Sequence, residues 1–231
     1  MDTFSRYAIY FAPEAGSPLA NFGAHWLGWD AQSGKATAPY PNIEGVAQPV
    51  CDLSASPRKY GFHGTLKPPF KLADGYSADM LKAALSRFAK THTAFEVPEI
   101  KLRSLGGFLA ITPDGHSYAL GKLAQACVED FDIFRAAPTE AELARRRSTS
   151  LTTAQEQYLL QWGYPYVFDE FRFHLTLTGR LKPKTLAKVK SHLAGVLAGP
   201  LAQPLPVKDV CLFGEAPSGA FHIIDRYALS A

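Results

Sequence analysis

The sequence predicts an α+β protein in which two similar lobes face each other across a central cleft. The first observation is a repeat, because the pattern F-H-x-T-L occurs at residues 62–66 and again at residues 173–177. The second observation is that each copy precedes the same order of segments, one with helical spacing and then two with strand character. The third is the length of 231 residues, which suits one large domain or two small lobes.

Two regular elements are expected before the first copy of the repeat. Residues 6–11 predict a strand, and residues 19–27 predict a helix. Residues 31–57 contain many Gly, Pro, Ser and Asn residues, which favours a long loop. We expect the first lobe to follow this loop, centred on residues 58–135.

The first lobe continues with a helix and two strands. Apolar residues recur at three- and four-residue steps over residues 77–90, at Met80, Leu81, Ala84, Leu85 and Phe88. Ser77 is a suitable N-cap for this helix. Strands are predicted over residues 95–104 and 108–112, and the glycine pair between them marks the turn.

A helical connector and the second lobe complete the chain. The connector is expected over residues 139–162, where Thr139 and Glu142 fit a capping box. The second lobe is centred on residues 170–229. Its helix is predicted over residues 183–197 with Pro183 in the first turn, and its strands over residues 207–213 and 221–229. All 231 residues are thus expected to form one bilobal domain.

Composition excludes several classes of protein. Hydrophobic residues make up 47% of the chain and charged residues 19%, which excludes intrinsic disorder. No apolar run is long enough for a membrane-spanning helix, and the first residues do not resemble a secretory signal. The net charge of +3 makes long nucleic acid or a membrane surface an unlikely partner. Three widely spaced cysteines favour a reduced, cytoplasmic protein, and no oligomeric state can be predicted.

The repeated motif separates apolar from polar side chains. Successive residues of a strand project to opposite faces, so the Phe and Leu residues of each copy share one face. The other face carries, copy by copy, His63, Thr65 and Lys67, and Arg172, His174 and Thr176. We expect these polar rows to line the cleft between the lobes.

Two facing histidines suit paired acid–base chemistry, because imidazole titrates near neutral pH. One histidine would activate water for attack at phosphorus and the other would protonate the departing oxygen, although the sequence does not decide which does which. Thr65 and Thr176 would donate hydrogen bonds to the non-bridging oxygens, and Lys67 and Arg172 would add positive charge. A phosphodiester satisfies this whole set of groups.

Other residues carry weaker signals. The five remaining histidines have no repeated context and are expected to be structural. Tyr10 and Tyr60 are candidates to stack on a sugar or a base, although aromatic residues near strands are more often part of a core. The run Arg145-Arg146-Arg147 would reach a second phosphate from the connector, or it is a solvated basic helix face.

At these residues the chain resembles the two-histidine (2H) phosphoesterase superfamily, which includes cyclic phosphodiesterases and 2′-5′ RNA ligase-like proteins. The strings R-K-Y-G-F-H-G-T-L-K-P-P-F at residues 58–70, W-G-Y-P-Y-V at 162–167 and F-R-F-H-L-T-L-T-G at 171–179 are similar to signatures of its DUF1045-type branch. That branch is associated with phosphonate-utilisation operons.

The resemblance implies a bilobal fold of two pseudo-symmetric antiparallel-sheet lobes with outer helices. It also implies metal-independent hydrolysis of a small phosphodiester, catalysed by His63 and His174 with help from Thr65 and Thr176, and without a cofactor. The branch suggests a cyclic, ribose-type phosphodiester that arises in phosphonate breakdown.

Two other interpretations stay open. A non-catalytic module would bind RNA ends or phosphorylated nucleotides in the same cleft without turning them over. A metallohydrolase is disfavoured, since neither H-E-x-x-H nor H-x-H-x-D nor a Cys/His cluster occurs in the sequence.

Overall fold

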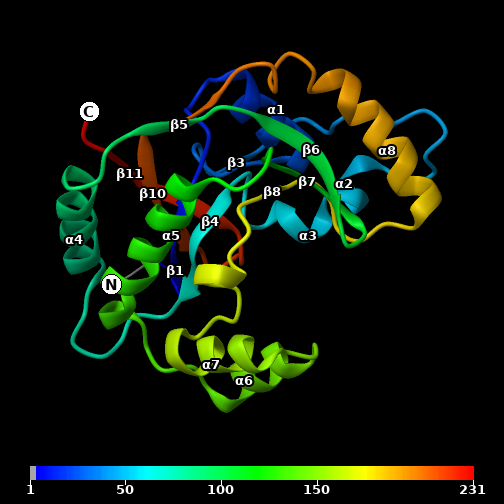
Figure 1. The fold of residues 1–231 in the computed structure, drawn as a ribbon. Helices are drawn as coiled ribbons and strands as arrows, with labels where there is room; N and C mark the ends of the chain where they lie inside the picture. The colour runs from blue at the N-terminus through cyan, green and yellow to red at the C-terminus, as the bar shows by residue number, and fades with distance from the viewer. Residues whose placement is uncertain (1–3) are drawn as a thin grey trace.

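The computed structural model describes residues 4–231 and has an α+β architecture, as the sequence predicts. Its centre is a seven-stranded antiparallel sheet with the order β11-β10-β1-β4-β8-β7-β6 (Figure 1). These strands are β1 (Tyr7–Phe11), β4 (Gly64–Phe70), β6 (Ile100–Leu105), β7 (Phe108–Pro113), β8 (Leu175–Thr176), β10 (Asp209–Glu215) and β11 (Phe221–Ala228).

Helices surround this sheet, and two small sheets accompany it. The longer helices are α1 (Pro18–Leu27), α4 (Ala78–Lys90), α5 (Tyr118–Asp130), α6 (Glu140–Arg147), α7 (Thr153–Trp162) and α8 (Pro183–Val196). The short ones are α2 (Val50–Leu53), α3 (Ala55–Arg58), η1 (Asp132–Phe134) and η2 (Phe168–Glu170). The small sheets pair β2 (Trp29–Asp30) with β3 (Lys35–Ala36), and β5 (Phe95–Val97) with β9 (Leu205–Val207).

The large sheet has two halves, β11-β10-β1-β4 and β8-β7-β6, and each half contains the hairpin that follows the motif strand of the other. Helix α4 follows β4 and packs on β10 and β11, but the next hairpin, β6–β7, pairs with β8 in the other half. Reciprocally, helix α8 follows β8 and packs on β6 and β7, whereas hairpin β10–β11 pairs with β1 beside β4. The sequence predicts lobes centred on 58–135 and 170–229, but each half of the sheet contains strands from both ranges.

The chain passes from one half of the sheet to the other through β5 and β9. Strand β5 lies between α4 and the hairpin β6–β7, and β9 lies between α8 and the hairpin β10–β11. These two crossing segments pair with each other in antiparallel register, from Phe95↔Val207 to Val97↔Leu205. Backbone hydrogen bonds therefore hold the two crossings together. The halves themselves meet at the pair Gly64↔Leu175 of β4 and β8.

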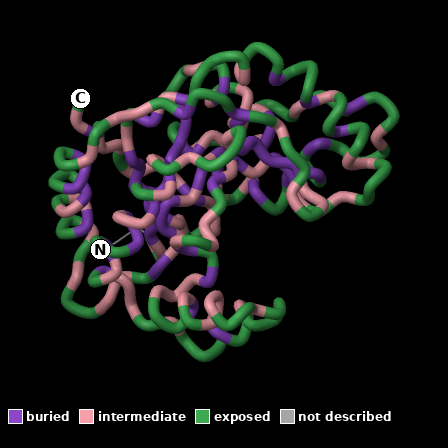
Figure 2. Tube along the Cα trace, in the orientation of Figure 1, coloured by how far each residue is buried: buried purple, intermediate pink, exposed green. Residues whose placement is uncertain are grey.

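Most predicted elements are present with small shifts of their ends. The Ser77 hydroxyl accepts a hydrogen bond from Met80 N at the start of α4, as a cap should. The connector is two helices, because α6 and α7 are separate, and Thr139 forms the expected capping box with Glu142. The two lie side by side at the bottom of Figure 1, with mostly exposed residues (Figure 2).

The structure differs from the prediction in three places: a loop that contains regular elements, a strand that is divided, and a helix that was not predicted. The long loop over 31–57 contains β3 and helix α2, and helix α3 spans its end. The strand expected over 95–104 divides into β5 and β6. Helix α5 is missing from the predicted elements, although its buried side chains follow helical spacing, at Leu120, Leu123, Ala124, Cys127 and Val128.

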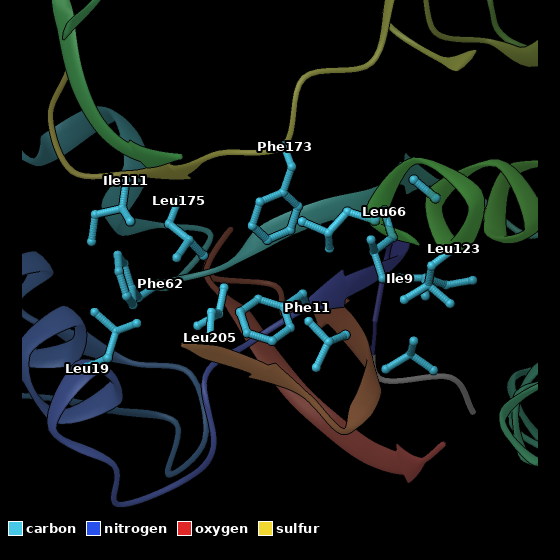
Figure 3. Close-up of a cluster of buried hydrophobic side chains, with 14 of the residues drawn as sticks. Ile9, Phe11, Leu19, Phe62, Leu66, Ile111, Leu123, Phe173, Leu175 and Leu205 are labelled. Carbon is cyan, nitrogen blue, oxygen red and sulfur yellow. The ribbon is translucent and has the colours of Figure 1, made fainter. Parts of the chain in front are cut away.

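The main core lies between the sheet and its helices and includes the apolar side chains of both F-H-x-T-L copies. Phe62, Leu66, Phe173 and Leu175 are all buried there (Figure 3). The ring of Phe173 meets the ring of Phe11 edge-on at a centroid distance of 5.7 Å. The apolar face of the motif is therefore a core face, as the alternation of side chains predicts.

Candidate active site

His63 enters β4 from a turn that fixes the orientation of its ring. Gly61 has φ 72°, a left-handed conformation that glycine adopts readily, and its carbonyl oxygen lies 2.9 Å from His63 Nδ1. A carbonyl oxygen can only accept, so Nδ1 carries the proton and donates. The Nε2 atom lies 3.2 Å from the Thr65 hydroxyl. In the neutral ring, Nε2 is therefore the atom with a free electron pair.

His174 repeats this arrangement in the second copy. Its Nδ1 donates to the carbonyl oxygen of Arg172, two residues earlier, at 2.7 Å. The equivalent bond of His63 also reaches the residue two positions earlier, Gly61. The same backbone contact thus sets the same tautomer in both copies and leaves both Nε2 atoms available for chemistry.

Strand pairing brings the two motifs together. Gly64 of β4 pairs with Leu175 of β8. In an antiparallel pair this register places Thr65 across from His174 and His63 across from Thr176, all on one face of the sheet. A positive charge on His174 also lowers the pKa of His63, which requires the two rings to be near each other. The structure therefore assembles the four predicted catalytic side chains into one cluster.

Burial governs the electrostatics of His63. Loss of solvent around the ring lowers the pKa of His63 to about 4, although the bond to Gly61 opposes this shift. The charge of His174 lowers the pKa further. His63 is consequently neutral at neutral pH, with Nε2 ready to accept a proton.

A cavity of about 350 Å³ opens beside Thr65 and His174. Aromatic rings form much of its wall, and Arg172 lies at its edge; the aromatic residues are Phe108, Tyr164, Tyr166, Phe168 and Phe171. The ring of Phe108 is 5.9 Å from the His174 imidazole. A cavity of this size holds a small organic molecule, with one end at Thr65 and His174.

Tyr10 does not occupy the position that the sequence predicts for it. It is a predicted substrate-binding residue, but its side chain is only 1% exposed. Its ring stacks on His63 with a centroid distance of 3.9 Å. Tyr10 therefore supports the imidazole from behind and is closed to a substrate. Tyr60 is half-buried, 6.0 Å from His63 between ring centroids, and remains a candidate to contact a ligand.

Lys67 is also placed differently from the prediction. The pairing of β1 with β4 slips by one residue, from Tyr10↔Thr65 to Ile9↔Lys67, which is a β-bulge. The bulge turns Lys67 to the core face, where it is 1% exposed. Its Nζ donates to the Val128 carbonyl at 3.0 Å. Lys67 thus fastens α5 to β4 and does not line the cleft.

Arg172 keeps its predicted place beside His174. The side chain is exposed, lines the cavity and donates to the carbonyl oxygens of Asp169 and Phe171, at 2.7 Å and 2.8 Å. It is therefore able to meet the charge of a phosphate bound in the cavity.

Tyr164 is a residue of the cavity for which the repeat predicts no role. The Tyr164 ring lines the cavity, and burial raises the pKa of its hydroxyl, with the charge of Arg146 acting in the opposite direction. The signal was present in the W-G-Y-P-Y-V string, since Gly163 ends α7 with φ 72° and directs the chain toward the cavity.

Two features are absent from residues 4–231. None of the helices in this range is long and apolar enough to cross a membrane. Within the same range, no group of three or more His, Cys, Asp or Glu side chains is arranged to hold a metal ion.

Two pseudo-equivalent HxT motifs place their histidines on one face of the sheet, which is the arrangement that the resemblance to two-histidine phosphoesterases predicts. The particular family is DUF1045, described as a protein family of unknown function, whose family model matches residues 65–222. The chain belongs to this family. The matched range contains Thr65 and the whole second motif.

Two curated relatives share the name "Ribose 1,5-bisphosphate phosphokinase PhnN". The protein from Janthinobacterium sp. (strain Marseille) is 37% identical over 227 residues, covering 95% of this chain and 49% of the relative. The protein from Laribacter hongkongensis (strain HLHK9) is 33% identical over 219 residues, covering 93% of this chain and 49% of the relative. The chain thus spans about half the length of the curated relatives it matches.

Solved structures with a related arrangement are more distant. A structure titled as a phosphoesterase has a TM-score of 0.44 at 13% identity, covering 98% of this chain and 99% of the other. E. coli LigT complexed with ATP has a TM-score of 0.44 at 13% identity, with complete coverage of both chains. E. coli LigT complexed with 3′-AMP has a TM-score of 0.43 at 15% identity, covering 98% of each chain.

Proposed function

We propose that this protein is a metal-independent phosphodiesterase that hydrolyses a small, cyclic, ribose-type phosphodiester by two-histidine acid–base catalysis. The observation that carries the proposal is the cluster of two matched histidines, each with Nδ1 fixed on a backbone carbonyl and Nε2 available. Such a pair supplies both a proton acceptor and a proton donor.

In this mechanism His63 acts as the base, because its lowered pKa keeps the ring neutral. Its Nε2 takes a proton from water as the water oxygen attacks phosphorus. His174, in its doubly protonated form, donates the proton on Nε2 to the leaving ribose oxygen as the P–O bond breaks and keeps the Nδ1 proton on the Arg172 carbonyl. The hydroxyls of Thr65 and Thr176 and the guanidinium of Arg172 stabilise the non-bridging oxygens, whose charge changes in the transition state.

The substrate class is supported by the names of the relatives. Both names contain ribose 1,5-bisphosphate. Opening a 1,2-cyclic phosphate on ribose at the C2 oxygen leaves a phosphate on C1. A cyclic ribosyl phosphate is thus one hydrolysis step away from the type of compound that those names contain, and the process fits phosphonate catabolism in the cytoplasm.

We assign the phosphokinase activity in those names to the other half of the relatives. The sequence has Gly-Lys pairs at residues 34–35 and 121–122, and neither is followed by the Ser or Thr of a P-loop.

The test is a screen of cyclic phosphodiesters in the presence of a chelator, with the products identified by phosphorus NMR. We expect 2′,3′-cyclic nucleotides or ribose 1,2-cyclic phosphate to be opened to monoesters. Activity that disappears with chelator and returns with added metal would exclude the metal-independent mechanism. Tight binding of nucleotides without turnover would favour the non-catalytic module instead.

The roles of the two histidines are tested separately. We expect His63→Ala and His174→Ala each to lower kcat by about 10²–10⁴-fold, since each removes one proton-transfer step. His116→Ala is the matched control, because His116 is exposed and does not line the cavity. Full activity in either catalytic variant would remove that histidine from the mechanism.

A further inference from the structure

A second, strongly basic cavity is lined by residues that follow or precede those of the catalytic cavity in the chain, with Pro69 next to Pro68 and Gly163 next to Tyr164. Its volume is about 70 Å³, and it lies between the end of β4 and helix α6. This volume has room for roughly five water-sized atoms. Five of its lining residues are cationic: Arg6, Lys71, Arg135, Arg145 and Arg146. Glu142 is the single acidic residue in the lining.

Part of this positive charge is already neutralised. Arg6 forms a two-bond contact with Glu215, at 2.6 Å for both bonds. Arg135 pairs with Asp132. The Glu142 carboxylate is occupied by the capping box, where it accepts from Thr139 N at 2.8 Å and from the Thr139 hydroxyl at 3.0 Å.

The other three cations are not bound in this way, although the charges of Lys71 and Arg145 reach the Glu142 carboxylate and, after the backbone hydrogen bond from Thr139, help to lower its pKa. Within residues 4–231, Lys71, Arg145 and Arg146 form no ion pair with a carboxylate. In contrast, the next arginine of the same helix, Arg147, pairs with Glu156. The basic cavity therefore keeps an excess of positive charge that is available to an anion.

Aromatic side chains connect this cavity to the catalytic one. The guanidinium of Arg146 lies over the Tyr164 ring, 4.8 Å from its centroid. Tyr164 lines the catalytic cavity, and both it and Tyr60 are near enough to the buried Tyr10 hydroxyl to contribute, after burial itself, to its raised pKa. Tyr60 is in turn 6.0 Å from His63. Arg146 thus contacts a ring that forms part of the catalytic cavity wall, and only the Tyr164 ring lies between its guanidinium and that cavity.

We propose that Lys71, Arg145 and Arg146 form a second anion subsite, and that it binds a phosphate of the substrate which is not cleaved. This rests on the proposed function, and it specifies the substrate as a cyclic ribosyl phosphodiester with a second, terminal phosphate. Guanidinium groups bind phosphate by paired, charge-assisted hydrogen bonds. Hydrolysis adds water across one P–O bond of the cyclic ester: the water oxygen bonds to phosphorus and the ribose oxygen leaves with a proton. The second phosphate is unchanged, so the product is a ribosyl bisphosphate.

The experiment compares two substrates, ribose 1,2-cyclic phosphate with and without a 5-phosphate. We expect Arg146→Gln and Lys71→Gln each to lower kcat/KM about 10–100-fold for the 5-phosphorylated substrate and less than about threefold for the other. Arg146→Lys should restore part of the loss. The matched control is Arg147→Gln, which should leave both values unchanged. Equal losses for both substrates would overturn the subsite, because they would indicate a general disturbance of the fold.

A binding measurement separates failure of the subsite from failure of the proposed function. Calorimetry with ribose 1,5-bisphosphate is made on His174→Ala, and on the same variant with Arg146→Gln added. Weaker binding in the double variant supports the subsite even if neither cyclic substrate is turned over. Equal binding in both, or none in either, overturns it.

Discussion

At the scale of single residues, the site is built from two histidines whose surroundings are alike in the backbone and unlike in packing. Both bind a carbonyl two residues earlier through Nδ1. The His63 ring also stacks on the Tyr10 ring, with 3.9 Å between the centroids, whereas the ring packed nearest to His174 among the described residues is that of Phe108, tilted and at 5.9 Å. The tight stacking explains why burial is the main cause of the lowered pKa of His63.

The lowered pKa of His63 predicts a dependence of stability on pH. It is about 4 in the folded chain and 6.5 in the unfolded chain, so below pH 6.5 the unfolded state binds more protons. This histidine therefore lowers the free energy of unfolding as the pH falls from 6.5 toward 4. Above pH 6.5 it has little effect on that free energy. Relative to His63→Gln, the wild type should lose about 2 kcal/mol of unfolding free energy between pH 7 and pH 5. Urea denaturation at both pH values measures this difference. Parallel losses in both proteins would contradict it.

Much of the residue-level site is predictable from the repeat and strand alternation. His63, Thr65, His174 and Thr176 lie on one strand face as expected. Lys67 does not, because the β-bulge after Thr65 reverses the alternation. Pro68 and Pro69, which follow directly, are the sequence signal for such an irregularity. Tyr10 is misassigned because alternation predicts the face on which a side chain lies but not how far that side chain is buried. Phe213 and Phe221 pack against Tyr10 and cover it.

At the scale of elements, the two motif strands approach each other closely because of one glycine. A Cβ built on Gly64 would lie 2.4 Å from the ring of Phe173, which belongs to the second motif. The variable position of the first F-H-x-T-L copy therefore has a steric constraint that the repeat pattern alone does not reveal. The absence of a side chain at Gly64 lets Phe173 of the second copy pack over the strand of the first.

This contact predicts a specific loss of stability. Gly64→Ala should destabilise the protein by about 1–3 kcal/mol, because the added methyl group overpacks the space held by Phe173. Gly121→Ala in α5 is the control, since its added Cβ would meet no atom within 4 Å. It should stabilise the protein by about 0.4–1 kcal/mol. Thermal unfolding of both variants compares them, and an unchanged Tm for Gly64→Ala would show that Phe173 moves aside freely.

Helices are predictable where a cap and an apolar stripe coincide, as in α4, or where a capping box marks the start, as in α6. Helix α5 has both signals, a Ser117 cap and a stripe from Leu120 to Val128. It went undetected because it lies between the repeat units and has no counterpart in the second copy. The pairing of strands across the repeat was not predictable, since alternation says nothing about which strands become neighbours.

At the scale of the whole molecule, the exchanged hairpins make each half of the sheet depend on both parts of the sequence. Strands β6 and β7 complete the half that contains β8, and β10 and β11 complete the half that contains β4. One hydrophobic core cluster includes residues from both halves, among them Leu66 and Leu175. We therefore expect the two halves to unfold together.

Denaturation with two probes tests this expectation. Trp26 is buried and donates a hydrogen bond to the Leu177 carbonyl at 2.7 Å, so tryptophan fluorescence, to which Trp29 and Trp162 also contribute, responds to the packing of α1 against the second motif. Far-ultraviolet circular dichroism reports on all helices. The two transitions should coincide at one midpoint. Two separate midpoints would mean that the halves are independent despite the exchange.

The exchange also limits how such a protein can evolve. In a chain of two consecutive, self-contained repeats, one copy can be lost or replaced while the other keeps its fold. Here the removal of either copy takes away the hairpin that completes the other half of the sheet, together with one member of the pairing between β5 and β9. A single copy would therefore lack the hairpin that completes its half of the sheet, and it could recover that hairpin only from a second chain that exchanges hairpins in the same way.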